Sequence, residues 1–517
     1  MTHILIYDTT LRDGAQTEGI SFSLEDKLEM MEKLDSFGMD FIEGGMPPSN
    51  PKDQEIFASP PVLKNSRLVA FGSTCRPNVP ASEDEGLRTL ISCKCDWVCI
   101  FGKSWDFHVT EALGTTLEEN LRMVKESTSF LRNSGKKVIF DAEHFFDGFK
   151  TNREYAMQVL DAAKEAEWIV LCDTNGGNLP TYIGEVTAEI VKATKKNIGI
   201  HCHNDSDMAV ACSLSAVRNG ATMVQGTVNG IGERCGNANL CSVIPNLKLK
   251  MDCDVPVDLT KLTGLSYSIA EIANIRHVPH MPFVGEKAFA HKGGMHVSAL
   301  MKDTRTYEHI PPESVGNKRQ ILISDMSGRA SISEKLKEMN IDADDATINR
   351  IKETVKEKES VGYQYEGADA SLRLLIERVK GNIRTPFTVQ GFRLSIDGIG
   401  VTDLQSEASI KVKDDSGNVE HTASDGDGPV NALDKSLRKA LSKFYPVIND
   451  IRLTDYKVRV LDERAATAAR VRVLIRSTDG KSTWSTVGVS ENVIEASLIA
   501  LSDSMEYAIM MEKGMKQ

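Results

Sequence analysis

The sequence predicts an α/β protein in which a parallel (β/α)₈ barrel is followed by helical linker subdomains and a C-terminal α+β domain. Short β-branched runs alternate with segments of helical period eight times before about residue 250. Polar side chains interrupt these runs where they end, and alternating strands begin at Pro386. We therefore expect a barrel over 1–251, linker subdomains over 252–385 and a further domain over 386–517. A doubly wound open sheet is the alternative for the barrel.

The eight strands of the predicted barrel are mainly apolar runs of five to seven residues, within the usual length of buried strands. They are Ile4–Asp8, Phe41–Met46, Leu68–Thr74, Trp97–Phe101, Val138–Glu143, Trp168–Asp173, Ile198–His203 and Met223–Asn229. Helical periodicity marks the segments between them, among them Leu24–Phe37, Leu117–Leu131, Arg153–Ala166, Thr181–Ala193 and Met208–Arg218. Gly38 supplies a left-handed C-terminal cap for the first of these helices.

The linker subdomains and the last domain show different patterns. We expect linker helices at Leu259–Asn274, Ile332–Asn340, Ala346–Glu359 and Asp369–Val379. In the last domain we expect strands at Phe387–Ile396, Ala408–Lys413, Ile451–Leu461 and Ala469–Arg476, and helices at Val430–Lys443 and Val493–Met510. Because Val430-Asn431-Ala432 aligns with Ile494-Glu495-Ala496, the sequence predicts an internal ββα duplication.

Composition excludes several classes of function. The 517 residues carry a net charge of −12, which disfavours binding to nucleic acid or to an anionic membrane surface. No segment approaches the roughly 20 apolar residues of a membrane span. The N-terminus lacks the basic leader and cleavage site of a signal peptide, and the ten cysteines are scattered as free thiols are in a reducing compartment. We expect a cytoplasmic protein.

Polar residues fall at the ends of the predicted strands, where barrel enzymes carry their chemistry. Such residues follow or close the first, second, fifth, sixth and seventh strands: Arg12-Asp13, Glu43, Glu143, Asp173-Thr174, and His201 with His203. Structural ion pairs and loop contacts are the alternative for single members. Charges at this many strand ends favour a shared site.

His201-Cys202-His203 indicates a metal site within that group. Alternate residues of a strand face the same side, so both imidazoles project together. Asp13 follows the first strand, which neighbours the eighth in a closed barrel, and the Gly-rich stretch Gly230–Asn237 can add the amide oxygen of Asn237. One carboxylate, two imidazoles and one amide suit Mn²⁺ or Mg²⁺, with Zn²⁺ as the alternative.

Four motifs make the chain resemble a known family. Two segments are similar to the two signatures of the 2-isopropylmalate, homocitrate and citramalate synthases. They are Leu11-Arg12-Asp13-Gly14-Ala15-Gln16, followed after ten intervening residues by Lys27, and His201-Cys202-His203-Asn204-Asp205. Gly232–Leu240 and His291-Lys292-Gly293-Gly294-Met295-His296 resemble further segments of that family. The resemblance implies a TIM barrel that condenses acetyl-CoA with a 2-oxo acid and then hydrolyses the thioester.

The resemblance also implies roles for individual residues. Asp13, His201, His203 and Asn237 would hold the metal, Arg12 would stabilise the developing alkoxide, and Thr174 would bind the substrate carboxylate. Glu143 and His291 would handle protons, with the division between base and acid left open, and Tyr307 would assist thioester hydrolysis. Glu143 as a loop anchor and His291 as an ordinary loop histidine are the alternatives.

Within the family the sequence looks most like the citramalate branch, which uses pyruvate and leads to isoleucine. Homocitrate synthases commonly carry Glu in place of Asp13, and isopropylmalate enzymes usually carry Glu in place of Ala15. The 2-isopropylmalate branch, with 2-oxoisovalerate, remains the alternative. An acyl-CoA lyase of the same barrel type would lack the C-terminal duplication.

The C-terminal region resembles an allosteric domain that binds an end-product amino acid between paired subunits. This resemblance predicts a homodimer that isoleucine inhibits. The alternative is a domain that only dimerises the chain.

Overall fold

The computed structural model describes residues 2–324, 327–382, 384–399, 402–461, 469–512 and 514. The chain forms two compact units. The first comprises residues 1–289 and 310–318, and the second comprises residues 290–309 and 319–517.

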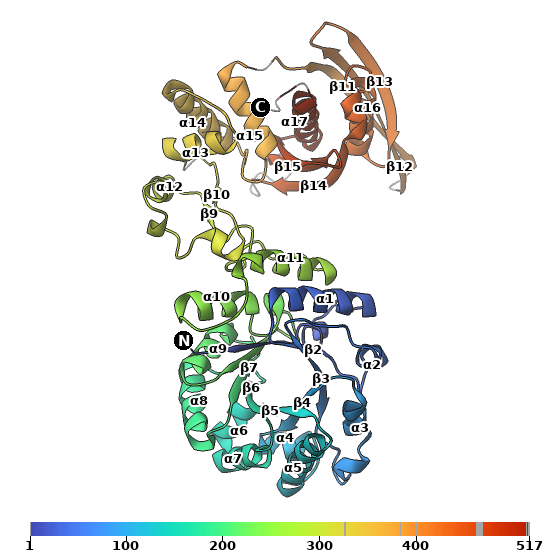
Figure 1. The fold of residues 1–517 in the computed structure, drawn as a ribbon. Coiled ribbons are helices and arrows are strands. Elements are labelled where there is room, and N and C mark those ends of the chain that lie inside the picture. Colours follow the sequence, from blue (N-terminus) through green and yellow to red (C-terminus); the bar gives the residue numbers. More distant parts are fainter. Residues whose placement is uncertain are drawn as a thin grey trace. The chain divides into compact units, whose positions relative to one another are not determined.

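The first unit is built on a closed barrel of eight parallel strands, in chain order around the ring (Figure 1). They are β1 Leu5–Asp8, β2 Phe41–Gly45, β3 Arg67–Ser73, β4 Trp97–Lys103, β5 Lys137–Glu143, β6 Trp168–Asp173, β7 Ile198–Cys202 and β8 Met223–Gly226. The ring closes where β1 pairs with β8, with Leu5 opposite Met223. This closure confirms the predicted barrel and excludes the open sheet.

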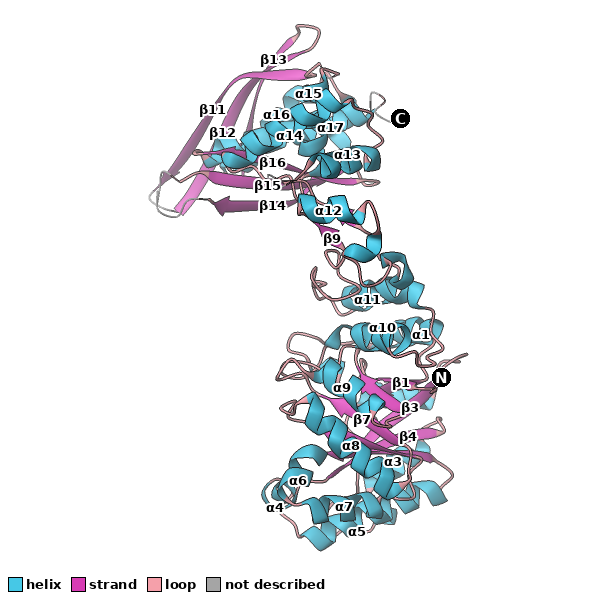
Figure 2. Cartoon of the chain, turned by 90° about the vertical axis from the view of Figure 1, so that its left-hand side faces the viewer, coloured by secondary structure: helices cyan, strands magenta, loops and turns pink. Residues whose placement is uncertain are grey.

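Helices surround the barrel strands, and Figure 2 shows them on the outside of the ring. They are α1 Leu24–Phe37, α2 Pro51–Ala58, α3 Glu85–Ser92, α4 Asp106–Glu111, α5 Leu117–Asn133, α6 Phe145–Thr151, α7 Arg153–Ala162, α8 Pro180–Thr194, α9 Ala209–Arg218 and α10 Leu240–Lys250. Local sequence fixes the ends of α1. Ser23 and Asp26 form a reciprocal capping box at its start, and Gly38 closes it in the left-handed conformation at φ 100°.

Residues 252–289, expected in the linker, pack with the barrel. Helix α11, Leu262–Ile272, buries Leu262, Leu265 and Ile269 in the same hydrophobic core as the barrel helices. The apolar face of this helix is therefore covered by the first unit.

The second unit begins with a short parallel strand pair and four helices. These are β9 Ala290–His291, β10 Gln320–Ile321, α12 Gly294–Leu300, α13 Arg329–Glu338, α14 Asp345–Ser360 and α15 Asp369–Lys380.

Two similar halves follow. The first contains β11 Phe387–Ile399, β12 Thr402–Asp414, β13 Val419–Gly426 and α16 Pro429–Leu441, and the second contains β14 Arg452–Val460, β15 Val471–Thr478, β16 Thr483–Ser490 and α17 Val493–Glu512. Each half is an antiparallel three-stranded sheet with one helix. The repeat is thus βββα, and the predicted ββα unit lacked β13 and β16. Strand β13 reads Val-Glu-His-Thr-Ala-Ser-Asp-Gly and is largely polar, so its hydrophobic pattern is weak.

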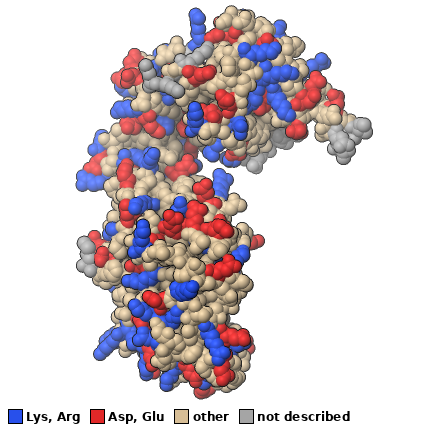
Figure 3. Space-filling model, turned by 45° about the vertical axis from the view of Figure 1, so that its right-hand side comes forward, with Lys and Arg blue, Asp and Glu red and all other residues tan. Residues whose placement is uncertain are grey.

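The surface carries charges of both signs. On the face drawn in Figure 3, Lys and Arg side chains are interspersed with Asp and Glu side chains. None of the helices within the described residues combines the length and the apolar character needed to cross a bilayer. All ten cysteines are free thiols.

Candidate active site

A cavity of about 270 Å³ opens at the carboxyl ends of the barrel strands. Six residues singled out from the sequence line it together: Arg12, Asp13, Glu143, Thr174, His201 and His203. They come from several different strands or the loops directly after them, so the closed barrel itself brings them to one place.

Asp13, His201 and His203 form the metal-binding geometry of this cavity. Their ligand atoms lie within 4.8 Å of one another, and all three side chains are buried. Asp13 Oδ1 and His203 Nδ1 are buried and have no hydrogen-bond partner among the described residues. Buried polar atoms are rarely left unpaired, so these atoms fit an ion that they would ligate.

Asn237 joins this group through the Gly-rich segment after β8. Residues 236–238 run antiparallel to the end of β7, with Asn204 N–H donating to Gly236 O at 2.9 Å and Ala238 N–H donating to Cys202 O at 2.9 Å. This pairing sets Asn237 opposite His203. Asn237 Oδ1 is buried and unpaired within the described part of the chain, so it fits the same donor set.

Electrostatics keep these ligands in the forms that bind metal. Burial tends to raise the pKa of Asp13, but Arg12, His201 and His203 outweigh it, and the pKa of Asp13 lies below its ordinary value. Burial lowers the pKa of both imidazoles, that of His203 to about 4. Near pH 7 the site therefore holds a carboxylate and two neutral imidazoles.

Gln225 on β8 fixes the orientation of His201. Gln225 Nε2 donates to Asp141 Oδ1 at 3.0 Å, so its carbonyl oxygen faces His201 Nδ1 at 2.9 Å and must accept a hydrogen from it. His201 is thus protonated on Nδ1, and Nε2, 3.4 Å from Asp13 Oδ2, keeps its lone pair for a metal. The sequence analysis missed Gln225 and Asp141, although a polar residue within an apolar strand was the available signal.

Arg12 is held by Glu43 and by an aromatic ring. Its Nε donates to Glu43 Oε1 at 2.6 Å, and its guanidinium carbon lies 3.8 Å from the centre of the Phe71 ring. Glu43 also accepts from the hydroxyls of Tyr7 and Thr9 and is fully buried. Arg12 Nη2 makes no hydrogen bond within the described residues and remains for a ligand.

Glu143 and Thr174 lie on neighbouring strand ends. Lys103, the last residue of β4, is the register partner of Glu143 and forms an ion pair with it. The sequence analysis missed Lys103, because its role depends on the β4–β5 register. Thr174 Oγ1 accepts from His144 N–H at 2.8 Å, so the hydroxyl keeps its own hydrogen for donation.

His291 and Tyr307 belong to the second unit, so the barrel does not itself contain them. His291 Nε2 lies 3.2 Å from Glu308 Oε1, and Arg319 binds both oxygens of Glu308 at 2.7 and 2.6 Å. Tyr307 stacks on His296 with ring centres 4.1 Å apart and is half-exposed. Their roles in catalysis stay predictions.

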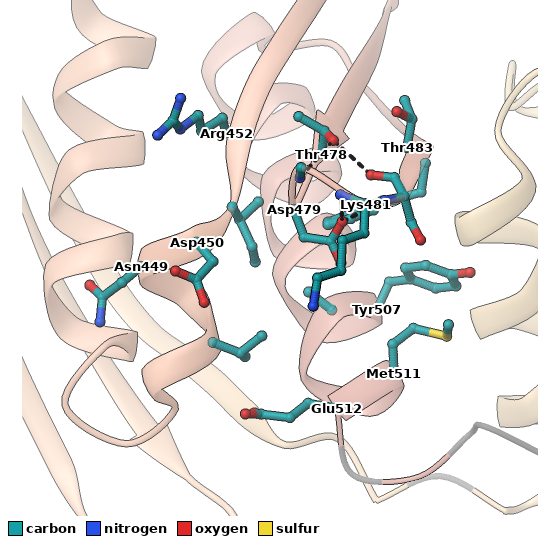
Figure 4. A pocket seen from close by; sticks show the side chains of 16 residues that line it. Asn449, Asp450, Arg452, Thr478, Asp479, Lys481, Thr483, Tyr507, Met511 and Glu512 are labelled. Atoms are coloured by element: carbon teal, nitrogen blue, oxygen red, sulfur yellow. Dashed lines mark hydrogen bonds between the residues drawn. The ribbon is translucent and has the colours of Figure 1, made fainter.

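A larger cavity, of about 820 Å³, lies in the second unit beside the β15–β16 hairpin and the end of α17 (Figure 4). Its charged groups do not form a catalytic cluster. Asp479 Oδ1 accepts from the backbone N–H groups of Lys481 and Ser482 and so closes the hairpin turn. The smaller barrel cavity, with its convergent polar groups, is therefore the candidate active site.

Three family models match consecutive parts of the chain, and the first of them covers the barrel that contains this site. The HMGL-like model matches residues 3–269, which is more than half of the chain. A model described as the homocitrate synthase post-HMGL domain-like matches residues 283–362, and the LeuA allosteric (dimerisation) domain matches residues 366–509. The closed barrel and this match define the class, an HMGL-like barrel protein with a LeuA-type C-terminal domain.

Curated relatives narrow the class. An (R)-citramalate synthase of Aquifex aeolicus is 54% identical over 99% of this chain and 98% of its own length, and one of Geobacter sulfurreducens is 51% identical over 98% of each. A probable 2-isopropylmalate synthase of Methanopyrus kandleri is 33% identical over 96% of each. The chain belongs to the (R)-citramalate synthase family, and the predicted resemblance is confirmed.

Proposed function

We propose that the chain condenses acetyl-CoA with pyruvate and water to give (R)-citramalate and CoA, as an acyltransferase on the route to isoleucine in the cytoplasm. The observation that carries this proposal is the convergence of Arg12 with Asp13, His201 and His203 in one barrel cavity. The full-length similarity to (R)-citramalate synthases supports the choice of substrates.

Asp13, His201, His203 and Asn237 would hold a divalent ion, Mn²⁺ or Mg²⁺ with Zn²⁺ as the alternative, because their donors are mixed oxygen and nitrogen atoms without thiolate. When bound, such an ion supplies Lewis acidity to a ketone oxygen. Arg12 adds a permanent positive charge, and its Nη2 is available to the alkoxide oxygen that forms when the carbonyl is attacked. The Thr174 hydroxyl donates to the substrate carboxylate.

Both stages of the reaction need proton transfers. The acetyl methyl group loses a proton as the enolate forms, and the alkoxide that results from attack on the ketone takes up a proton to become the hydroxyl. In the hydrolysis, water loses a proton as it adds to the thioester carbon, and the CoA sulfur leaves with a proton. Glu143, held at the cavity by Lys103, and His291, held by Glu308, are the two groups we propose for these transfers. Tyr307 is proposed to assist the hydrolysis.

Thiol release from acetyl-CoA tests this function. The protein is incubated with Mn²⁺ or Mg²⁺ and, in parallel, with pyruvate, 2-oxoisovalerate and 2-oxoglutarate. We expect release with pyruvate. Release with 2-oxoisovalerate alone would assign the chain to the 2-isopropylmalate reaction, and no release with any oxo acid refutes the synthase function.

A variant of one proposed ligand tests the metal site. His203→Ala is expected to lose Mn²⁺ binding and turnover, and full turnover of this variant refutes the metal site.

We propose that the C-terminal domain pairs two subunits and senses isoleucine. On β11, Phe392 and Ile396 lie opposite Ile410 and Ser406 and so share the face of β12 that is buried, yet their side chains are 42% and 52% exposed. On β14, Val458 lies opposite the buried Val473 in the same way and is 45% exposed. Each half thus leaves an apolar strip of its edge strand uncovered, and a second copy of the chain would cover both.

An amino acid effector fits a cavity of about 510 Å³ beside the start of α16. Asp434 and Arg452 offer charges of both signs, and Val430, Ile451 and Leu453 offer apolar surface, which suits the charged head and branched side chain of isoleucine. We expect isoleucine to inhibit thiol release and leucine to be much weaker. Inhibition by leucine alone would favour the 2-isopropylmalate branch.

A further inference from the structure

Lys27 belongs to the N-terminal signature, and the proposed chemistry gives it no role. It lies in the first turn of α1, and only 4% of its surface is exposed. Lysine is almost never buried to this extent unless its charge is paired. Its partner, Asp53 of α2, is equally buried, at 3% exposure.

This ion pair joins two helices to the end of a barrel strand. Lys27 Nζ donates to Asp53 Oδ1 at 2.5 Å and lies 3.4 Å from Gly44 O at the end of β2. The second oxygen of Asp53 accepts from Met46 N–H at 2.7 Å. The two charged side chains therefore hold the two ends of one short backbone segment, Lys27 at Gly44 O and Asp53 at Met46 N–H.

The backbone passes so close to Asp53 that only glycine fits at position 45. Gly45 has φ 148°, and a Cβ atom placed there would lie 2.3 Å from the Asp53 carboxylate. The register of β2 against β3 shifts at this point, between Glu43 and Gly45. The pair thus fixes a specific bend where the strand leaves the barrel.

That bend connects two parts of the candidate active site. Glu43, directly before it, holds Arg12 by the 2.6 Å bond to Nε, and Met46, at its far end, lines the cavity. A shift of the bend would move the anchor of the guanidinium and the wall that faces the substrate.

We propose that Lys27 and Asp53 are positioning residues for the 2-oxo acid: by fixing the bend at Gly44 to Met46 they set Glu43, and through it Arg12, and they set the wall formed by Met46. This inference rests on the proposed function. Neither residue lines the cavity. A displacement of about 1 Å at a reacting group costs on the order of 100-fold in rate, so a positioning pair of this kind has a measurable effect.

Three variants test the pair: Lys27→Met, Asp53→Asn and both together. We expect each single variant to lower kcat/KM for pyruvate about tenfold or more, with a lower kcat because Arg12 acts on the developing alkoxide and a higher KM because Met46 lines the cavity. Mn²⁺ affinity should stay within about twofold, because the pair does not touch the metal ligands. The double variant should regain part of the loss, since neither charge is then left alone and the amide that replaces the Asp53 carboxylate still offers an oxygen to Met46 N–H. If Lys27→Met does not fold, Asp53→Asn carries the test.

The matched control is Lys136→Met. Like Lys27, Lys136 binds backbone near a barrel strand through Nζ, which donates to the oxygens of Cys93 and Cys95 at 2.7 Å. It precedes β5 at the opposite end of the barrel strands. Its loss should lower the urea midpoint and leave kcat/KM for pyruvate unchanged. Equal losses of kcat/KM in Lys136→Met and Lys27→Met, at matched urea midpoints, would overturn the proposal.

Amide hydrogen exchange gives a readout that does not depend on activity. Met46 N–H should exchange about tenfold or more faster in Asp53→Ala than in the wild-type protein, with exchange in β5 and β6 unchanged. Unchanged exchange at Met46 overturns the inference. A wild-type protein that releases no thiol with any oxo acid refutes the proposed function instead, and the exchange experiment still decides whether the pair fixes the bend.

Discussion

Gln225 illustrates at the scale of one residue how an amide determines which nitrogen of a histidine is free. Replacing it by leucine removes the acceptor for His201 Nδ1 and the donor to Asp141. Outer partners of this kind typically contribute about 10- to 100-fold to metal affinity. We therefore expect Gln225→Leu to weaken Mn²⁺ binding by about that factor in calorimetric titration.

The control for this prediction is Gln158→Leu, at an exposed position on α7. It makes the same chemical change away from the cavity and should bind Mn²⁺ as the wild-type protein does. Wild-type affinity in Gln225→Leu would show that His201 needs no such partner.

Phe101 offers a second prediction at this scale, on the choice of oxo acid. Its ring lines the cavity and stacks on Phe71, with ring centres 5.5 Å apart and planes inclined by 17°. Phe101→Ala opens space next to the substrate, and the larger side chain of 2-oxoisovalerate gains from that space more than the methyl group of pyruvate does. One methylene group in such a pocket changes specificity by about 10- to 200-fold.

We therefore expect the ratio of kcat/KM for 2-oxoisovalerate to that for pyruvate to rise about tenfold or more in Phe101→Ala. Phe107→Ala is the control, since Phe107 is 53% exposed and does not line the cavity. An unchanged ratio in Phe101→Ala would place the specificity-determining wall elsewhere.

The sequence could predict the site residues that lie at strand ends. It could not predict the side chains of neighbouring strands that hold those residues in place. Asp13, His201 and His203 follow from strand positions, because the parallel barrel turns those positions toward one edge. Lys103 and Gln225 depend on register and on side-chain orientation across strands. Phe71 and Phe101 look like ordinary strand residues until the cavity is known.

At the scale of elements, the Gly-rich segment after β8 depends on one backbone conformation. Gly236 has φ 85°, and a Cβ atom there would lie 1.9 Å from Gly230 O. Gly236→Ala must therefore displace the segment that sets Asn237 opposite His203. We expect Mn²⁺ affinity to fall about tenfold or more and the free energy of unfolding to fall by about 1–3 kcal/mol, measured by calorimetry and by urea denaturation.

Gly114→Ala is the control that separates backbone strain from displacement of the Gly-rich segment. Gly114 also has a positive φ, of 64°, but a Cβ atom there meets nothing within 4 Å. This variant should lose about 1 kcal/mol of stability and no metal affinity. Equal metal affinities in the two variants would contradict a role for the segment in the site.

The strands and helices with a strong hydrophobic pattern were predicted correctly, and those with a weak pattern were missed. Helix α1 and strand β6 lie at the predicted residues, since each has a clear apolar period and distinct ends. Strands β13 and β16 were missed because exposed or polar positions interrupt their alternation, and because pairing with a neighbouring strand stabilises them more than their own propensity does.

At the scale of the whole molecule, the net charge of −12 opposes the proposed substrates, which are anions. The candidate site therefore depends on local cations. Arg12 and Arg234 both line the cavity, and Lys103 pairs with Glu143. The electric field of the net negative charge repels anionic substrates, so it does not speed their association with the protein. Affinity must therefore come from the short-range contacts with these cations.

Assembly of the whole molecule gives the last prediction. Val458 on β14 and Ile396 on β11 lie in the uncovered apolar strips of the two edge strands, at 45% and 52% exposure. A charge in either strip would be buried in the paired state, where it costs several kcal/mol if it finds no partner. We expect Ile396→Asp and Val458→Asp to raise the dissociation constant of the dimer at least tenfold in sedimentation velocity, while the separated subunits stay folded because the strips are exposed in a single chain. Val62→Asp, at a position that is 92% exposed in the barrel unit, should leave the dimer intact. A dimer that persists in both strip variants would mean that the subunits pair through another surface.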